Sequence, residues 1–213
     1  MEMKVVNLYL PGCSLKTHCD NISEDNAVYT LEFNGQSTGF KVSVKQALVS
    51  DDWDAITLQQ VSSASVNYVS YQPYLDTLAE YARKYCSDSK IYMHQTWAYE
   101  EKSKLCTDLG YEKEEDMLKD AVCSYEKAAE AIKADGIIPS GKIMYALHRR
   151  VPVVHRDTFH ALFGVGRFAL ALGWFSYFTE KDISDIKFDR FDVPVSSEEY
   201  LAAIEAVNEV LGK

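Results

Sequence analysis

Short apolar runs alternate with helix-like segments along most of the chain, and this alternation limits the possible folds more than any other feature. The apolar runs are rich in β-branched and aliphatic residues, and they cover residues 5–10, 53–60, 90–95 and 136–139. Segments with apolar residues at helical spacing lie between them, most plainly over residues 71–85 and 114–134. Strands that alternate with helices pair in parallel, and the helices cover both faces of the sheet. The sequence therefore predicts an α/β fold with a mainly parallel sheet.

Local signals predict the remaining elements. Asn34-Gly35 stands between two alternating runs, which is typical of a β-hairpin. Ser43 and Ser140 are expected to cap short helices, and Ser196 to open a last amphipathic helix. An extended run over residues 151–161 leads into a helix that is expected from about residue 158 to residue 177.

Length and charge narrow the class of protein. The chain has 213 residues, of which 47% are hydrophobic, so one domain over residues 1–213 is expected. Its net charge of −10 repels phosphate backbones and anionic lipids, so a small molecule is a better candidate partner than nucleic acid or a membrane. No apolar run approaches the length of a bilayer span, and the first residues lack the pattern of a signal peptide. Five cysteines without a CxxC pair indicate reduced thiols and a cytoplasmic location.

Polar loops follow the expected strands. In α/β sheets, ligands bind beyond the carboxyl ends of the strands. The loops expected there read PGCSLKTH, QQVSSAS, HQTWAYE, IPSG and HRDTFH. They contain no metal-ligand spacing and no glycine-rich phosphate loop, so neither a metal nor an organic cofactor is expected.

Asp157 and His160 are the strongest candidates for catalysis. Their spacing of three residues, just before or inside the first turn of a helix, places both side chains on one side of that turn. A catalytic imidazole needs a carboxylate that fixes its tautomer and stabilises its protonated form. The alternative is that Asp157 caps the helix while His160 packs beneath it.

Amide and aromatic side chains at two strand ends are candidates for binding. Gln59 or Gln60 has an amide that can donate to a developing oxyanion, and the alternative is a hydrogen bond to loop backbone. In HQTWAYE, His94 and Trp97 are suited to line a site for a small polar substrate. His94 and His155 also lie in apolar runs, where a histidine satisfied within the core is the simpler interpretation.

Five segments, read in order, resemble a known family. VVNLYLPGCSL, WDAITLQQVS, YQPYLDTL, HQTWAYE and RDTFHALFGVGRFALAL are similar to bacterial SGNH-hydrolase-like domains of unknown function, which are related to GDSL-type esterases and carbohydrate acetylesterases. The resemblance covers nearly the whole chain and implies a flavodoxin-like three-layer α/β/α sandwich that hydrolyses esters with a Ser-His-Asp arrangement. It implies His160 and Asp157 as catalytic residues, and Gly12 and Gln59 as oxyanion-hole residues. Gln60, His94 and Trp97 are then the expected substrate-binding residues.

The chain departs from that family pattern at its start. Members open with a strand and a GNSF-like turn that holds the nucleophilic serine, whereas this chain begins at the equivalent of the second strand. We therefore expect the nucleophile block to be missing and one strand of the sheet to be lost or replaced. A second departure is Ser63, where relatives often have histidine.

Ser14 in GCSL has two interpretations. It follows a strand and a tight turn, so it could serve as a nucleophile at the start of a helix. The family order favours a different assignment, in which Ser14 caps the helix and the backbone amide of Gly12 is the functional group.

The expected function is that of an SGNH-type serine esterase on a small ester, such as an acetylated carbohydrate, with weak or no activity in this chain. Three alternatives stay open. The first is a non-catalytic relative that binds a carbohydrate or a partner, the second is a self-contained esterase that uses Ser14, and the third is a homo-oligomer assembled through an exposed sheet edge.

Overall fold

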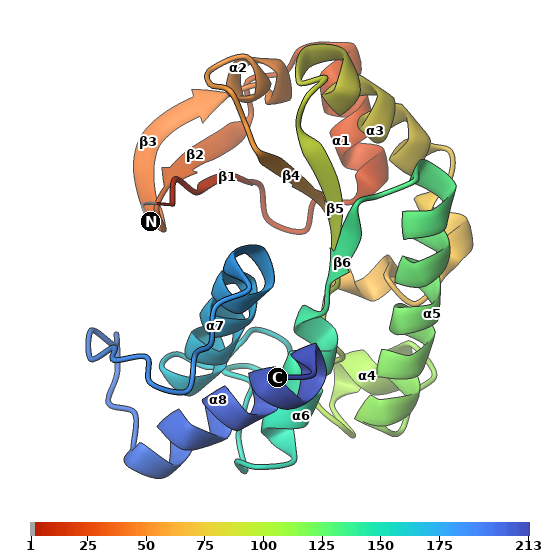
Figure 1. Cartoon of the computed structure of the whole chain (residues 1–213). Helices are drawn as coiled ribbons and strands as arrows, with labels where there is room; N and C mark the ends of the chain where they lie inside the picture. The colour runs from red at the N-terminus through yellow and green to blue at the C-terminus, as the bar shows by residue number, and fades with distance from the viewer. Residues whose placement is uncertain (1–2) are drawn as a thin grey trace.

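The strands form two sheets, each with three strands in the part of the chain that the computed structural model describes, residues 3–213 (Figure 1). One sheet is parallel and contains β4 (Ala55–Leu58), β5 (Lys90–His94) and β6 (Gly136–Ile138), in that order. The second sheet is antiparallel. The expected α/β class is confirmed, with the strands divided between these two sheets.

Helices connect and cover the parallel strands. α3 (Tyr74–Tyr85) links β4 to β5, and α5 (Glu114–Ile132) links β5 to β6. Successive side chains of a strand point to opposite faces of a sheet. Ile91 and Met93 are 2% and 0% exposed and belong to the core that β5 shares with α3 and α5.

The other face of β5 meets a different helix. Tyr92 makes edge-to-face contacts with Tyr177 and Phe178 of α7 (Val165–Thr179), with ring centroids 5.9 and 5.1 Å apart. The sheet therefore lies between two helical layers, in agreement with a three-layer α/β/α arrangement.

The antiparallel sheet has the order β1-β2-β3, formed by β1 (Val6–Tyr9), β2 (Tyr29–Phe33) and β3 (Gln36–Val42). α1 (Leu15–Ser23) connects β1 to β2. The expected hairpin at Asn34-Gly35 is confirmed, because both residues have positive φ angles of 48° and 80°.

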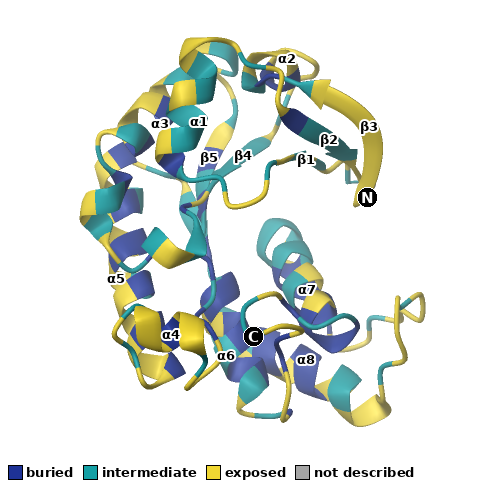
Figure 2. Ribbon diagram, turned by 180° about the vertical axis from the view of Figure 1, so that it is seen from behind, coloured by how far each residue is buried: buried dark blue, intermediate teal, exposed yellow. Residues whose placement is uncertain are grey.

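The last three helices form their own core. α6 (Ser140–His148) and α8 (Ser197–Leu211) pack with α7, and their buried apolar residues form one cluster. Gly173 permits the close approach of α6 and α7, because a Cβ at this position would lie 2.4 Å from Cδ1 of Ile143. Figure 2 shows buried residues on each of these three helices, whereas β3 is almost entirely exposed.

Two of the three expected helix starts are confirmed as side-chain caps. Ser43 caps α2 (Val44–Leu48) and Ser196 caps α8, each in a reciprocal capping box. Ser140 is different, because it is the first residue of α6 and the capping position belongs to Pro139, which offers no side-chain bond. The expectation that Ser140 caps a helix is therefore wrong, and its hydroxyl is used elsewhere.

The helix expected from residue 158 begins only at Val165. Thr158 and Gly164 have φ angles of 72° and 74°, and these left-handed residues prevent a continuous helix. Asp157 instead closes a turn by accepting a hydrogen bond from the backbone N–H of His160 at 3.0 Å. α4 (Lys104–Asp108) and two 3-10 turns, Ser62–Ala64 and Tyr68–Tyr71, lie outside the expected pattern.

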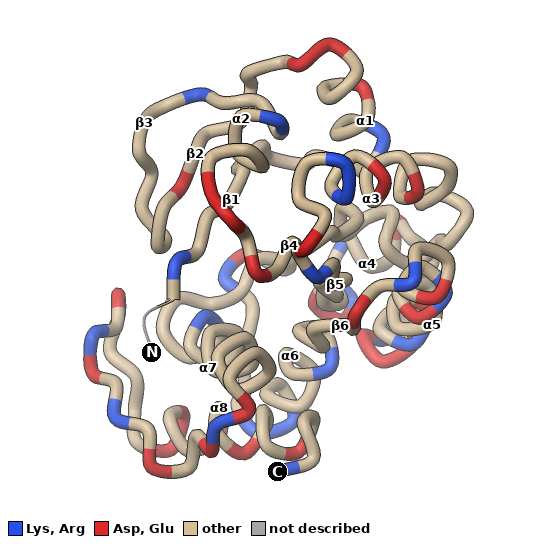
Figure 3. The backbone as a smooth tube through the Cα atoms, turned by 45° about the horizontal axis from the view of Figure 1, so that its top comes forward, with Lys and Arg blue, Asp and Glu red and all other residues tan. Residues whose placement is uncertain are grey.

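Charged residues of both signs are interleaved over the surface (Figure 3). None of the helices within residues 3–213 combines the length and the apolar character that a membrane crossing requires.

Candidate functional site

The carboxyl end of the parallel sheet brings three polar side chains together. Gln59 follows β4, His94 ends β5, and Ser140 follows β6. Nδ1 of His94 lies 2.6 Å from Oε1 of Gln59, and Nε2 lies 3.0 Å from the hydroxyl of Ser140. Because parallel strands end at the same edge, residues far apart in sequence meet here, as expected for a ligand site of an α/β sheet.

Trp174 of α7 determines which ring nitrogen of His94 carries the hydrogen. Its indole Nε1–H donates to Nε2 of His94 at 3.3 Å, and an indole nitrogen can only donate. Nε2 of His94 is therefore an acceptor, so the neutral ring carries its hydrogen on Nδ1. That hydrogen requires an acceptor, which means that Gln59 turns its carbonyl oxygen to the ring and its NH₂ group away from it.

His94 is held in the neutral form. Burial lowers its pKa from 6.5 to about 4, so it is uncharged near neutral pH. The amide nitrogen of Gln59 has no hydrogen-bond partner within residues 3–213, and Gln59 is exposed. His94 therefore orients a free amide donor at this edge of the sheet.

The turn after β1 lies near the same edge. Gly12 has a φ of 62°, in a turn that the bond from Cys13 N–H to Leu10 C=O closes at 3.3 Å. The N–H of Leu15 then donates to Oε1 of Gln60 at 3.1 Å. This bond ties the loop with Gly12 to the residue that follows Gln59.

Ser14 is a helix cap, as the family order predicted. Its hydroxyl accepts a hydrogen bond from the N–H of Thr17 at 3.1 Å and contacts the hydroxyl of Thr17 at 2.9 Å. In the described chain, none of the hydrogen bonds of Ser14 reaches a histidine.

Gln60 is occupied by the fold itself. It is 2% exposed, its Oε1 also accepts from the N–H of Val61 at 2.9 Å, and its Nε2 donates to the C=O of Ser70 at 3.0 Å. The expectation of a substrate-binding role for Gln60 is therefore corrected, because its amide holds loop backbone together.

Asp157 and His160 form a pair on the surface. Nδ1 of His160 lies 3.0 and 2.9 Å from the two carboxylate oxygens of Asp157, and the two side chains are 52% and 41% exposed. The hydrogen bond from His160 holds the pKa of Asp157 well below its usual range, with a further contribution from Arg156. The carboxylate thus fixes the ring with Nε2 directed away from it.

The loop that carries this pair rests on the segment after β5. Trp97 Nε1–H donates to the C=O of Phe159 at 2.6 Å, and the N–H of Glu100 donates to the C=O of Thr158 at 2.7 Å. His155 is buried and its Nε2 bonds the C=O of Ala98 at 3.1 Å, which confirms the core interpretation for this histidine. The indole of Trp97 is therefore used to position the loop.

The structure brings the predicted residues together in two groups. Gln59 and His94 form one group and Asp157 and His160 the other, and no hydrogen bond within the described residues joins them. Ser140 and Trp174 were not predicted for the site. The position of Ser140 after a strand was a usable signal, whereas nothing in the sequence links Trp174 to His94.

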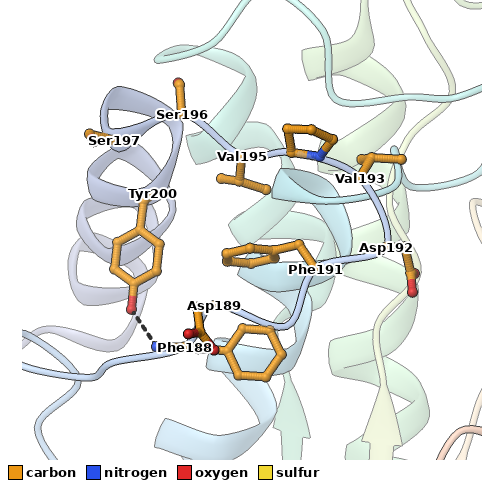
Figure 4. A pocket seen from close by; sticks show the side chains of 10 residues that line it. Phe188, Asp189, Phe191, Asp192, Val193, Val195, Ser196, Ser197 and Tyr200 are labelled. Atoms are coloured by element: carbon orange, nitrogen blue, oxygen red, sulfur yellow. Dashed lines mark hydrogen bonds between the residues drawn. The ribbon is translucent and has the colours of Figure 1, made fainter.

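Two hollows lie elsewhere. The larger, of about 510 Å³, is lined by the segment before α8 and by Tyr200, whose hydroxyl accepts from the N–H of Phe188 at 3.2 Å (Figure 4). The smaller, of about 210 Å³, contains Glu114 and His148, which bond each other. In residues 3–213, no group of three or more His, Cys, Asp or Glu side chains is arranged to hold a metal ion.

Comparisons with known proteins add family information. A family model described as a domain of unknown function, DUF4886, matches residues 1–208. The chain is also similar to the crystal structure of a DUF4886 family protein from Bacteroides uniformis ATCC 8492, with 26% identity and a TM-score of 0.89. That similarity covers 98% of this chain and 83% of the other. None of the curated proteins matches the sequence.

Proposed function

The chain belongs to the DUF4886 family, and we propose that it is a serine-esterase-like domain of the SGNH-hydrolase type that acts on a small ester, such as an acetylated carbohydrate. One observation carries this proposal, namely the imidazole of His160 bonded by Nδ1 to the carboxylate of Asp157 with Nε2 left free. This is the acid–base half of a Ser-His-Asp arrangement.

In the proposed mechanism, Nε2 of His160 takes a proton from the attacking oxygen. Asp157 keeps the ring in the tautomer with hydrogen on Nδ1 and stabilises the imidazolium that forms. The amide NH₂ of Gln59 and the N–H of Gly12 are the proposed donors to the oxyanion of the tetrahedral intermediate.

The attacking oxygen in this chain is proposed to be water. None of the hydroxyl groups within residues 3–213 forms a hydrogen bond with His160, and Ser14 is bonded to Thr17. We therefore expect slow turnover, because a serine nucleophile and its histidine together contribute about a million-fold in well-studied hydrolases.

The same observation favours a second candidate, a non-catalytic relative that binds a carbohydrate-like ligand at this edge of the sheet. It predicts ligand binding without hydrolysis.

Hydrolysis of p-nitrophenyl acetate distinguishes the two. We expect a low rate above buffer that returns to buffer in His160→Ala and falls roughly tenfold in Asp157→Asn. Asp192→Asn is the matched control, because Asp192 is an exposed carboxylate bonded to Arg167 at 3.1 Å. A rate equal to buffer in the wild type, or equal rates in all variants, supports the non-catalytic relative.

A fluorophosphonate probe tests the self-contained esterase separately. We expect no labelling of Ser14. Labelling of Ser14 that is lost in His160→Ala would make it the nucleophile.

A further inference from the structure

We propose that the larger hollow, beside the start of α8, binds a small organic cation that carries an alkylated ammonium group. Aromatic rings and carboxylates line this hollow together, and a positive charge is the ligand that both recognise. This inference goes beyond the proposed function and does not depend on hydrolysis.

Three aromatic rings line the hollow. Phe188 and Phe191 come from the segment before α8, and Tyr200 lies on α8 itself (Figure 4). The rings of Phe191 and Tyr200 meet at 86° with centroids 6.2 Å apart, and those of Phe188 and Phe191 meet at 82° and 5.0 Å. A cation is attracted to a ring face within about 6 Å of its centroid. One small cation can therefore contact more than one of these rings.

The fold holds the rings in place before a ligand binds. The buried ring of Phe168 on α7 contacts all three, with centroid distances of 5.9, 5.1 and 4.8 Å to Phe188, Phe191 and Tyr200. The hydroxyl of Tyr200 donates to the C=O of Ile186 at 2.6 Å and accepts from the N–H of Phe188. Phe188 is nevertheless 45% exposed, so its ring is available to a ligand. A preformed site of this kind loses less entropy on binding.

The charges that line the hollow are negative. Within residues 3–213, its charged lining residues are Asp189 and Asp192, and Asp192 is bonded to Arg167 at 3.1 Å. Asp189 has no ion-pair partner in the described chain, and Figure 4 shows it beside Tyr200 and Phe188. The hollow therefore offers one uncompensated carboxylate next to the aromatic rings.

The surroundings of the hollow do not cancel this charge. Lys187 and Arg190 are exposed on the same segment, but neither lines the hollow. Glu198 and Glu199 add two further carboxylates in the first turn of α8. The net charge of the chain, −10, also raises the concentration of cations at its surface.

The same lining disfavours the other classes of small ligand. An anion would meet the carboxylates of the hollow and of the first turn of α8. A carbohydrate needs placed donors and acceptors, and the hydroxyls of Ser196 and Tyr200 are already bonded to the chain. Within the described residues, no Asn, Gln or His lines the hollow to replace them.

Choline and its uncharged carbon analogue, 3,3-dimethylbutanol, provide a direct test, because the two have nearly the same shape. Each is titrated at constant ionic strength into the 213-residue protein with isotope-labelled Phe and Tyr, and the ring signals are followed by NMR. With choline, we expect saturable shifts at Phe188, Phe191 and Tyr200. We expect the uncharged analogue to bind more weakly by roughly tenfold or more.

Ring variants test the site itself. Phe191→Leu should weaken choline binding by about fivefold, because it removes one aromatic face. Phe40→Leu is the matched control, because it removes a ring that is 71% exposed on β3 and should leave binding unchanged. Phe188→Leu, at the more exposed ring of the hollow, repeats the test where Phe191→Leu lowers the urea midpoint.

Charge variants form a second pair. Asp189→Asn should weaken choline binding by roughly threefold, because an exposed carboxylate contributes modestly to the attraction of a cation. Asp185→Asn is the matched control, because Asp185 is an exposed acid on the same segment that does not line the hollow.

Four results would overturn the proposal. They are the absence of a saturable shift with choline, equal affinity for choline and its uncharged analogue, choline binding that is unchanged in both ring variants of the hollow, and shifts of these rings with N-acetylglucosamine but not with choline. Because every readout is binding, a failure here is separate from a failure of the proposed hydrolysis.

Discussion

His94 and His160 both lie beside polar partners, and their surroundings give them opposite properties. His94 is half-buried at the end of β5 between Gln59, Ser140 and Trp174, and desolvation lowers its pKa to about 4. His160 is half-exposed on a loop and its partner is the carboxylate of Asp157. We therefore expect the half-buried imidazole to orient its neighbours, and the exposed imidazole with a carboxylate partner to be the one used in the proposed chemistry.

The largest expected difference between the two histidines is the effect of removing each imidazole on the free energy of unfolding. His94→Ala leaves Gln59, Ser140 and the indole of Trp174 without their partner, and we expect the free energy of unfolding to fall by about 3 kcal/mol. His160→Ala should leave the urea midpoint nearly unchanged while it removes any hydrolysis. Urea denaturation at pH 7.5, followed by circular dichroism, measures the midpoint of each variant. Equal midpoints for the two variants would contradict the comparison.

The pH dependence of stability provides a second test of the comparison. The pKa of His94 is about 4 in the folded protein against 6.5 ordinarily, so the unfolded chain binds the proton first as the pH falls. The contribution of His94 to stability is therefore complete above about pH 6.5, falls between about pH 6.5 and 4, and falls no further below that range. The shift corresponds to roughly 3 kcal/mol.

A control is needed because burial also lowers the pKa of His18 to about 4. Burial lowers the pKa of His155 as well. His94→Gln should therefore keep only the part of the acid-induced loss that belongs to His18 and His155. A curve of stability against pH that is unchanged in His94→Gln would show that His94 is not held neutral by the fold.

Ser14 provides the smallest expected effect. Ser14→Ala removes the acceptor for the N–H of Thr17 at the start of α1, which costs about 1 kcal/mol. The rate of ester hydrolysis should stay unchanged, because a cap acts on stability alone. A large loss of the hydrolysis rate without a loss of stability would indicate that Ser14 takes part in the reaction.

Local signals predicted much of the fold. The hairpin at Asn34-Gly35 and the capping boxes at Ser43 and Ser196 depend on residues within a few positions of each other, so sequence alone reveals them. The pairing of Asp157 with His160 is local in the same sense.

Contacts between distant segments could not be predicted. Gln59 and Gln60 are the same amino acid at adjacent positions, so the sequence does not distinguish them. The pleat of β4 and the path of the following loop expose Gln59 and bury Gln60. Ser140 and Trp174 meet His94 from 46 and 80 residues away. The start of α7 was misplaced because the left-handed conformation of Thr158 depends on the turn that Asp157 closes.

The indole of Trp174 also has a consequence for ligand selectivity. Because it can only donate, it fixes His94 and, through His94, makes Gln59 present NH₂ rather than oxygen at the sheet edge. A site that offers donors discriminates in favour of carbonyl, carboxylate and hydroxyl oxygens and against ammonium groups, whose hydrogens would face hydrogens. We therefore expect the proposed site to prefer ligands with oxygen acceptors, a preference set by the contact of α7 with His94.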